Sequence, residues 1–169
     1  MMRAAGKCRI RLLVMDVDGT LTNGQIIVGQ NGEIAKAFNV KDGLGISHEL
    51  PKRDIIPAVI TGRESMTVSR RCAELGIREV YQGVKDKMQA LRLILHRYEC
   101  DFSNVAYIGD DINDLDCMIE VRKNGGLVGA PCDATAAVLE CADFVCVAGG
   151  GEGAVREFIE WVCRDECQA

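Results

Sequence analysis

Two aspartates separated by one residue follow an apolar segment near the start of the chain. Asp16 and Asp18 come after the run Leu-Leu-Val-Met at positions 12–15, and Gly19 and Thr20 follow them. Side chains two positions apart in an extended chain point the same way, so both carboxylates can face one site. Because neighbouring carboxylates repel each other, this pair favours a bound cation or a shared proton. The alternative is a strand closed by an aspartate-rich turn with both carboxylates in solvent.

Further polar groups occupy similar positions later in the chain. Thr61 and Asp110 directly follow apolar segments, and Lys87 opens an amphipathic segment just after a short extended one. At the carboxyl ends of parallel strands, such groups converge on the edge of the sheet where ligands bind. Each group also has a structural explanation. Thr61 fits a T-x-x-E capping box, Lys87 fits a solvated helix start, and Asp110 with Asp111 and Asp114 fits a helix cap.

Strands and helices alternate along the chain in the pattern of an α/β protein. Short apolar segments predict strands, and amphipathic segments predict helices. The predicted strands are residues 12–15, 54–60, 78–81, 104–109, 126–130 and 143–147, and the predicted helices are 41–50, 65–75, 86–98, 114–121, 134–141 and 154–164. This order predicts a Rossmann-like, doubly wound parallel sheet with helices on both faces, in a single domain spanning residues 1–169.

A small β-hairpin flap is predicted at about residues 25–39, where an Asn-Gly pair separates two extended segments. The interval between Asp18 and Thr61 is filled by this hairpin and a helix. The interval between Thr61 and Lys87 is filled by a helix and a strand. A separate cap domain needs on the order of 50 residues. The sequence therefore predicts no large cap domain.

The composition indicates a globular protein without features of a nucleic-acid or membrane binder. Hydrophobic residues make up 48% and charged residues 27%, and the net charge is −5. An acidic chain is a poor partner for polyanions, and no apolar segment has the length of a membrane span. The nine cysteines are odd in number and include no C-x-x-C pair. They fit small buried residues in a reducing compartment, so we expect a cytoplasmic protein.

The order of these motifs resembles the haloacid dehalogenase superfamily of phosphatases. The motifs are DxDGT at 16–20, Thr-Gly at 61–62, Lys87 and GDDxxD at 109–114. Within that superfamily the chain resembles the 3-deoxy-D-manno-octulosonate (KDO) 8-phosphate phosphatases over nearly its whole length. The segments that carry this closer resemblance are 38–43, 60–63, 81–83, 105–111 and 150–157.

The resemblance implies a phosphatase mechanism with an aspartyl phosphate. Asp16 would attack phosphorus, and Asp18 would protonate the departing sugar oxygen and then activate water. The implied cofactor is Mg2+, bound by Asp16, the Asp18 backbone carbonyl and Asp110, an oxygen set that suits this hard cation. Thr61 and the Gly62 N–H would bind phosphoryl oxygens.

Other residues have supporting roles by the same resemblance. Lys87 would neutralise the phosphoryl group and orient the nucleophile, and Asp111 and Asp114 would support the metal and the lysine. Substrate contacts are expected from Gly62, Arg63, Arg71 and Asn39. Arg71 matches a position that relatives offer to a substrate carboxylate across a subunit interface, and a solvated helix arginine is the alternative.

Three functions are compatible with these residues. Hydrolysis of KDO 8-phosphate is the expected one, and Arg63 favours it because the nonulosonate type tends to have Glu there. A nonulosonate (KDN or sialic acid) 9-phosphate phosphatase is the second. A non-catalytic oligomerisation module, like the domain attached to some acylneuraminate cytidylyltransferases, is the third. The intact Asp16 and Asp18 argue against the third, because a scaffold needs no nucleophile.

Without a cap, the site is open to solvent in one chain, whereas pockets for small ligands usually bury most of the ligand. Minimal-cap relatives close the site by forming tetramers. The hairpin at residues 26–38 is apolar enough to form an interface, so we expect a homotetramer built on these hairpins. The alternative is an ordinary edge ribbon.

Overall fold

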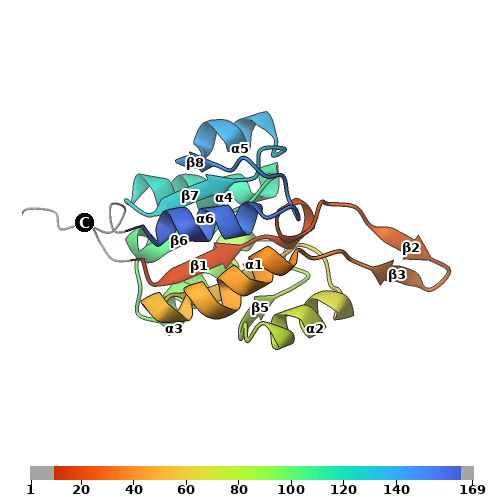
Figure 1. Cartoon of the computed structure of the whole chain (residues 1–169). Helices are drawn as coiled ribbons and strands as arrows, with labels where there is room; N and C mark the ends of the chain where they lie inside the picture. The colour runs from red at the N-terminus through yellow and green to blue at the C-terminus, as the bar shows by residue number, and fades with distance from the viewer. Residues whose placement is uncertain (1–9, 165–169) are drawn as a thin grey trace, which may run out of the picture.

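Six parallel strands form the centre of the structure, a computed structural model that describes residues 10–164 (Figure 1). Their order across the sheet is β5-β4-β1-β6-β7-β8, and a separate antiparallel pair, β2-β3, projects from one end of the domain. The strands are β1 Leu12–Met15, β2 Ile27–Gly29, β3 Gly32–Ala35, β4 Ile56–Ile60, β5 Glu79–Tyr81, β6 Val105–Ile108, β7 Leu127–Ala130 and β8 Phe144–Val145. The predicted α/β fold with a parallel sheet and a small hairpin is confirmed.

β1 lies inside the sheet because its side chains are apolar on both faces. All four of its residues are buried, and alternate residues belong to the two core clusters on opposite faces. Met15, its last residue, is level with Val59 of β4 and with Ile108 of β6. The residues that follow these three strands therefore emerge at the same edge of the sheet.

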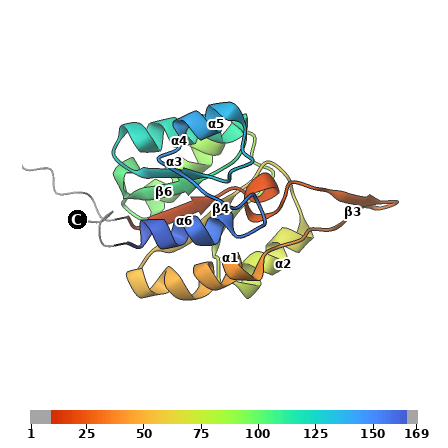
Figure 2. The same ribbon diagram turned by 45° about the horizontal axis from the view of Figure 1, so that its top comes forward.

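Helices cover both faces of the sheet (Figure 2). They are α1 Val40–Leu44, α2 Met66–Glu74, α3 Lys87–Arg97, α4 Ile112–Lys123, α5 Ala136–Cys141 and α6 Ala154–Val162, with short helical turns at Val17–Leu21, Gly45–Glu49, Pro51–Arg53 and Phe102–Asn104. Buried residues of α2 and α6 join one core cluster, and those of α3, α4 and α5 join the other. The two layers hold the strand ends, and hence the site, in a fixed arrangement.

Two predicted elements are divided or markedly shorter in the structure, and most of the others differ by one or two residues at their ends. The predicted helix 41–50 is divided into two parts, the short helix α1 and the wider helical turn at Gly45–Glu49. This segment contains Gly43 and Gly45, which lower helix propensity, and a Cβ at Gly43 would lie only 2.4 Å from the side chain of Arg71 on α2. The predicted strand 143–147 is reduced to the two residues of β8.

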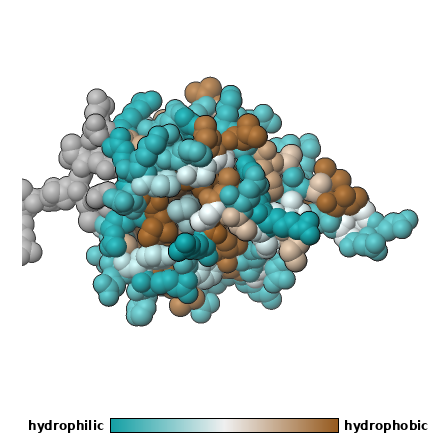
Figure 3. Space-filling view, turned by 60° about the horizontal axis from the view of Figure 1, so that its bottom comes forward, coloured by the Kyte–Doolittle hydropathy of each residue, from teal (hydrophilic) through white to brown (hydrophobic). Residues whose placement is uncertain are grey.

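The β2–β3 hairpin extends away from the body of the domain (Figure 1). Gly29 lies opposite Gly32 at its tip. Four of its apolar side chains are exposed, those of Ile26, Ile27, Val28 and Ile34. Figure 3 shows the corresponding hydrophobic surface on the projecting segment.

The described part of the chain contains seven cysteines, and all seven are free thiols. Cys8 and Cys167 lie outside the described residues. Within residues 10–164, no helix combines the length and the apolar character needed to cross a membrane.

Candidate active site

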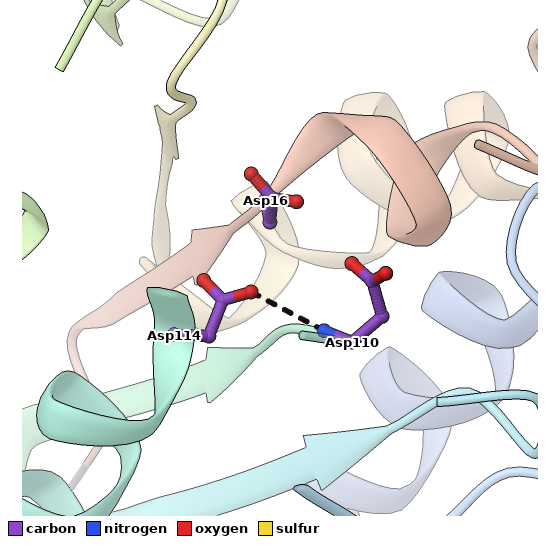
Figure 4. Close-up of side chains that lie close together, drawn as sticks. All are labelled: Asp16, Asp110 and Asp114. Carbon is purple, nitrogen blue, oxygen red and sulfur yellow. Dashed lines mark hydrogen bonds between the residues drawn. The ribbon is translucent and has the colours of Figure 1, made fainter. Parts of the chain in front are cut away.

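Three aspartates converge at the carboxyl edge of the central strands (Figure 4). The Asp16 N–H donates to the Ile108 carbonyl at 3.1 Å, which ties the end of β1 to the end of β6. Asp110 lies in the loop after β6, and Asp114 lies in the first turn of α4. One carboxylate oxygen from each of the three lies within 4.8 Å of the others. The fold thus brings together carboxylates that are far apart in the sequence.

Lys87, the first residue of α3, reaches into this cluster. Its Nζ donates to Asp16 Oδ1 at 2.7 Å and to Asp114 Oδ1 at 2.8 Å, and its side chain is only 3% exposed. Burial lowers the pKa of Lys87, but the charges of Asp16 and Asp114 outweigh burial and raise that pKa above its usual value. The lysine is therefore held as a cation against the first aspartate.

The donor set of the cluster fits a hard divalent cation. Asp114 is engaged by the protein itself, because its Oδ1 also accepts from the Tyr107 hydroxyl at 2.7 Å and its Oδ2 accepts from the Asp110 N–H at 3.3 Å. Asp16 and Asp110 are the better placed ligands. Burial and the Asp114 charge raise the pKa of Asp16 to about 8, and burial raises the pKa of Asp110 to about 6. A bound cation such as Mg2+ would favour the ionised form of both.

The turn after Asp18 is shaped around Asp110. Gly19 has a φ of 97°, and a Cβ there would lie 2.0 Å from Asp110 Oδ2, so a side chain is excluded at this position. The buried Thr20 hydroxyl donates to Asp110 Oδ1 at 2.9 Å. The group that lies closest to Gly19 is therefore the Asp110 carboxylate. The two contacts position Asp110 against the turn that carries the first two aspartates.

Asp18 contacts a lysine that sequence analysis did not select. Lys36, directly after β3, forms an ion pair through Nζ with Asp18 Oδ1, and the same Nζ lies 3.1 Å from Glu33 Oε2. On the other side, Arg63 Nε lies 4.0 Å from Asp18 Oδ2. Lysines in hairpins are usually solvated, and nothing in the local pattern around Lys36 indicates this contact. The signal exists only in the tertiary structure.

A pocket of about 180 Å³ opens over these groups. It is lined by Asp16, Asp18, Thr61, Gly62, Arg63, Asp111 and Asn113. Asn113 is the member that sequence analysis missed, and its place inside the GDDxxD motif is the signal that could have indicated it. The capping-box alternative for Thr61 is wrong, since α2 begins at Met66 and the Ser65 side chain caps it. Asp111 does cap α4, accepting from the Ile112 N–H at 2.7 Å.

Two predicted substrate residues lie outside this pocket. Arg71 forms an ion pair with Glu74 at 2.9 Å, its guanidinium lies 5.9 Å from the Phe38 ring centre, and it lines a groove of about 370 Å³ beside α2. Asn39 caps α1 and donates through Nδ2 to the Gly151 carbonyl at 3.2 Å. Both side chains have partners within the chain, and their contact with substrate stays a prediction.

The fold and the acidic site define a haloacid dehalogenase-like hydrolase, and the chain belongs to that family. A family model with this description matches residues 73–159. Within the family, the chain is similar to 3-deoxy-D-manno-octulosonate 8-phosphate phosphatase KdsC of Escherichia coli K12. The two are 47% identical over 148 residues, which cover 88% of this chain and 76% of the relative.

Solved structures of the same kind of enzyme are also similar. The 3-deoxy-D-manno-octulosonate 8-phosphate phosphatase of Yersinia pestis has a TM-score of 0.86 and 43% identity, covering 94% of this chain and 82% of that one. The enzyme of Moraxella catarrhalis, in complex with magnesium, phosphate and KDO, has a TM-score of 0.85 and 40% identity, covering 94% and 87%. These similarities confirm the resemblance that the motifs indicated.

Proposed function

We propose that this chain is a Mg2+-dependent phosphatase that hydrolyses KDO 8-phosphate to KDO and phosphate. The observation that carries this proposal is the pair Asp16 and Asp18 in one pocket, with Lys87 on the first carboxylate. The 47% identity to KdsC favours KDO 8-phosphate over a nonulosonate 9-phosphate. The pair also disfavours a non-catalytic module, which requires neither carboxylate.

The chain's own residues account for the bond changes. Asp16 forms a bond to phosphorus as the bond from phosphorus to the sugar oxygen breaks, and Asp18 donates a proton to that oxygen. Asp18 then takes a proton from a water molecule, whose oxygen attacks phosphorus and releases phosphate from Asp16. Lys87 holds Asp16 in place and offsets the negative charge between the nucleophile and the phosphoryl group. Thr61 and the Gly62 N–H bind phosphoryl oxygens in this proposal.

Asp16, Asp110 and the Asp18 backbone carbonyl would hold Mg2+. When bound, the ion supplies positive charge for the phosphoryl oxygens and the nucleophile. Asp114 supports this arrangement by accepting hydrogen bonds from Lys87 Nζ and from the Asp110 N–H. Asp111 borders the pocket as the cap of α4.

The pocket needs further walls for a sugar acid. Its volume of about 180 Å³ is below the roughly 300 Å³ at which ligand pockets usually begin. A homotetramer built on the exposed hairpins would supply these walls, with Arg71 of one chain facing the substrate carboxylate in another. Arg63 and Asn39 would contribute from the same chain. The tetramer, the single domain over residues 1–169 and the cytoplasmic location are predictions that accompany this proposal.

A phosphatase assay across a panel of sugar phosphates tests the proposal. The panel includes KDO 8-phosphate, KDN 9-phosphate and sialic acid 9-phosphate, each with Mg2+ and with EDTA. We expect the highest kcat/KM with KDO 8-phosphate, no turnover in EDTA, and recovery on addition of Mg2+. Ca2+ should replace Mg2+ poorly, because its coordination is larger and looser. A higher kcat/KM for a 9-phosphate, or turnover that survives exhaustive chelation, would contradict the proposal.

A further inference from the structure

Lys36 is the one charged residue of the described hairpin whose side chain is completely buried. It lies directly after β3, whose residues alternate between exposed and half-buried. A buried ammonium is costly unless it is paired. Here Nζ is paired with two carboxylates, those of Asp18 and Glu33. The hairpin therefore inserts a fixed cation beside the pocket.

The second carboxylate anchors this lysine to the domain. Glu33 accepts through Oε1 from the Ser65 hydroxyl, and Ser65 Oγ accepts from the Val68 N–H at 3.4 Å as the cap of α2. Lys36 is thereby linked through Glu33 and Ser65 to a helix of the main domain. Its position depends on more than the hairpin itself.

The contact with Asp18 divides the roles of the two carboxylate oxygens. Oδ1 is engaged by Lys36. Among residues 10–164, Oδ2 has only Arg63, at 4.0 Å, and the Arg63 side chain is half exposed at the pocket. A carboxylate fixed through one oxygen cannot rotate freely, so the other oxygen keeps a constant direction.

We infer that Lys36 is a positioning residue, which holds Asp18 so that its second oxygen faces the bridging oxygen of the substrate. The inference rests on the proposed phosphatase function and deepens it. The hairpin then acts in catalysis through Asp18, in addition to any part it has in an interface. Proton delivery to the leaving group is the step that depends on it.

The test compares two leaving groups in single-turnover experiments with Mg2+ and excess enzyme. A sugar alkoxide must be protonated as it leaves, whereas p-nitrophenolate leaves without a proton. Lys36→Met keeps the buried stem but removes the ammonium. We expect it to slow release of the sugar from KDO 8-phosphate by about 10²-fold, the scale of a misplaced catalytic group, and release of p-nitrophenolate by less than about 3-fold. Lys36→Arg should restore most of the lost rate.

Two further variants complete the experiment. Lys52→Met removes an exposed lysine that also pairs with a glutamate, and it should change neither rate. Glu33→Gln keeps the ammonium but weakens its anchor. We expect it to slow release of the sugar more than release of p-nitrophenolate, with a smaller loss of rate than in Lys36→Met. This variant also tests the inference if Lys36→Met does not fold. An equal loss for both leaving groups would overturn the inference, and so would an unchanged rate with the sugar phosphate. Failure of the proposed function is distinguishable from failure of this inference, because the unsubstituted protein would then not hydrolyse KDO 8-phosphate. In that case the same variants would be compared on the sugar phosphate that the protein hydrolyses fastest.

Discussion

The carboxyl edge of the sheet and the β2–β3 hairpin differ in whether their side chains find partners within one chain. At the edge, buried charged groups find partners from other elements of the same chain, as Lys87 does with Asp16 and Asp114. On the hairpin, Val28 and Ile34 are 68% and 64% exposed and have no core to enter. The charged groups at the edge therefore have partners within one chain, whereas the apolar side chains of the hairpin are left exposed. This contrast supports a division in which one chain supplies the chemistry and several chains supply the walls of the pocket.

The first prediction breaks the edge and leaves the hairpin intact. Asp16→Asn should lower kcat by on the order of 10⁴-fold or more, because it removes the proposed nucleophile. The fold should persist, since a neutral side chain replaces a carboxylate whose pKa burial already raises to about 8. The measurement is kcat on KDO 8-phosphate with Mg2+, together with circular dichroism. Turnover near that of the unsubstituted protein in a clean Asp16→Asn preparation would exclude the mechanism.

The second prediction breaks the hairpin and leaves the edge intact. Val28→Asp should convert a tetramer to smaller species in light scattering, because a charge replaces an apolar side chain in the proposed interface. It should raise KM for KDO 8-phosphate by about 10-fold, and it should change turnover of p-nitrophenyl phosphate much less. The control is Val147→Asp, at a site that is 88% exposed on the loop after β8.

Arg71→Ala sharpens the same comparison. If a neighbouring Arg71 binds the substrate carboxylate, KM should rise for the sugar acid and not for p-nitrophenyl phosphate. A monomer that is fully active on KDO 8-phosphate would contradict both expectations about the hairpin interface.

The last prediction concerns stability, and its effect is the smallest. The pKa values of Asp16 and Asp110, about 8 and about 6, lie above the roughly 3.9 of an unfolded aspartate. Protonation of these groups therefore favours the folded state, so their contribution is full below about pH 4 and is lost as the pH rises through 6 and 8. Between pH 5 and pH 8, we expect the Tm of the metal-free protein to fall by at least about 3 °C.

Mg2+ separates the site from other buried carboxyls in this experiment. Saturating Mg2+ should reduce the fall in Tm, because it favours the ionised aspartates of the site. Burial also raises the pKa of Asp42 to about 6, but its Oδ1 accepts from the Arg156 N–H, away from the proposed metal ligands. Asp42→Asn should therefore flatten the pH dependence by the same amount with and without Mg2+. Identical pH dependence of the unsubstituted protein in both conditions would contradict a metal site at these aspartates.

The strands and their ends were predictable because their signals are local. An apolar segment that stops at Asp16 or Asp110 indicates both the strand and its functional end, and parallel pairing then brings these ends together. The division of helix 41–50 was less predictable, because the amphipathic pattern continues across it, and the close approach of Gly43 to α2 also has no local signal. Local patterns indicate elements, whereas such packing is decided by elements elsewhere in the chain.

The supporting contacts of the site could not be predicted for the same reason. Tyr107 has the pattern of a core strand residue, yet its hydroxyl donates to Asp114. Lys36 has the pattern of a solvated hairpin lysine, yet it is buried against Asp18. Each contact joins residues whose own neighbours in sequence carry no sign of the partner. Motifs indicate the groups that are proposed to react, and the structure shows which groups contact them.

The position of β1 has a consequence for the order in which the site is formed during synthesis. β1, which Asp16 directly follows, is made before β4 and β6, but it lies between them in the sheet. The hydrogen bond from Thr20 to Asp110 spans 90 residues of sequence. Until β6 has left the ribosome, β1 has one unpaired edge and Asp16 has no acidic partner from that side. Loop closure over such a distance slows folding, so we expect the edge of β1 that faces β6 to be paired late.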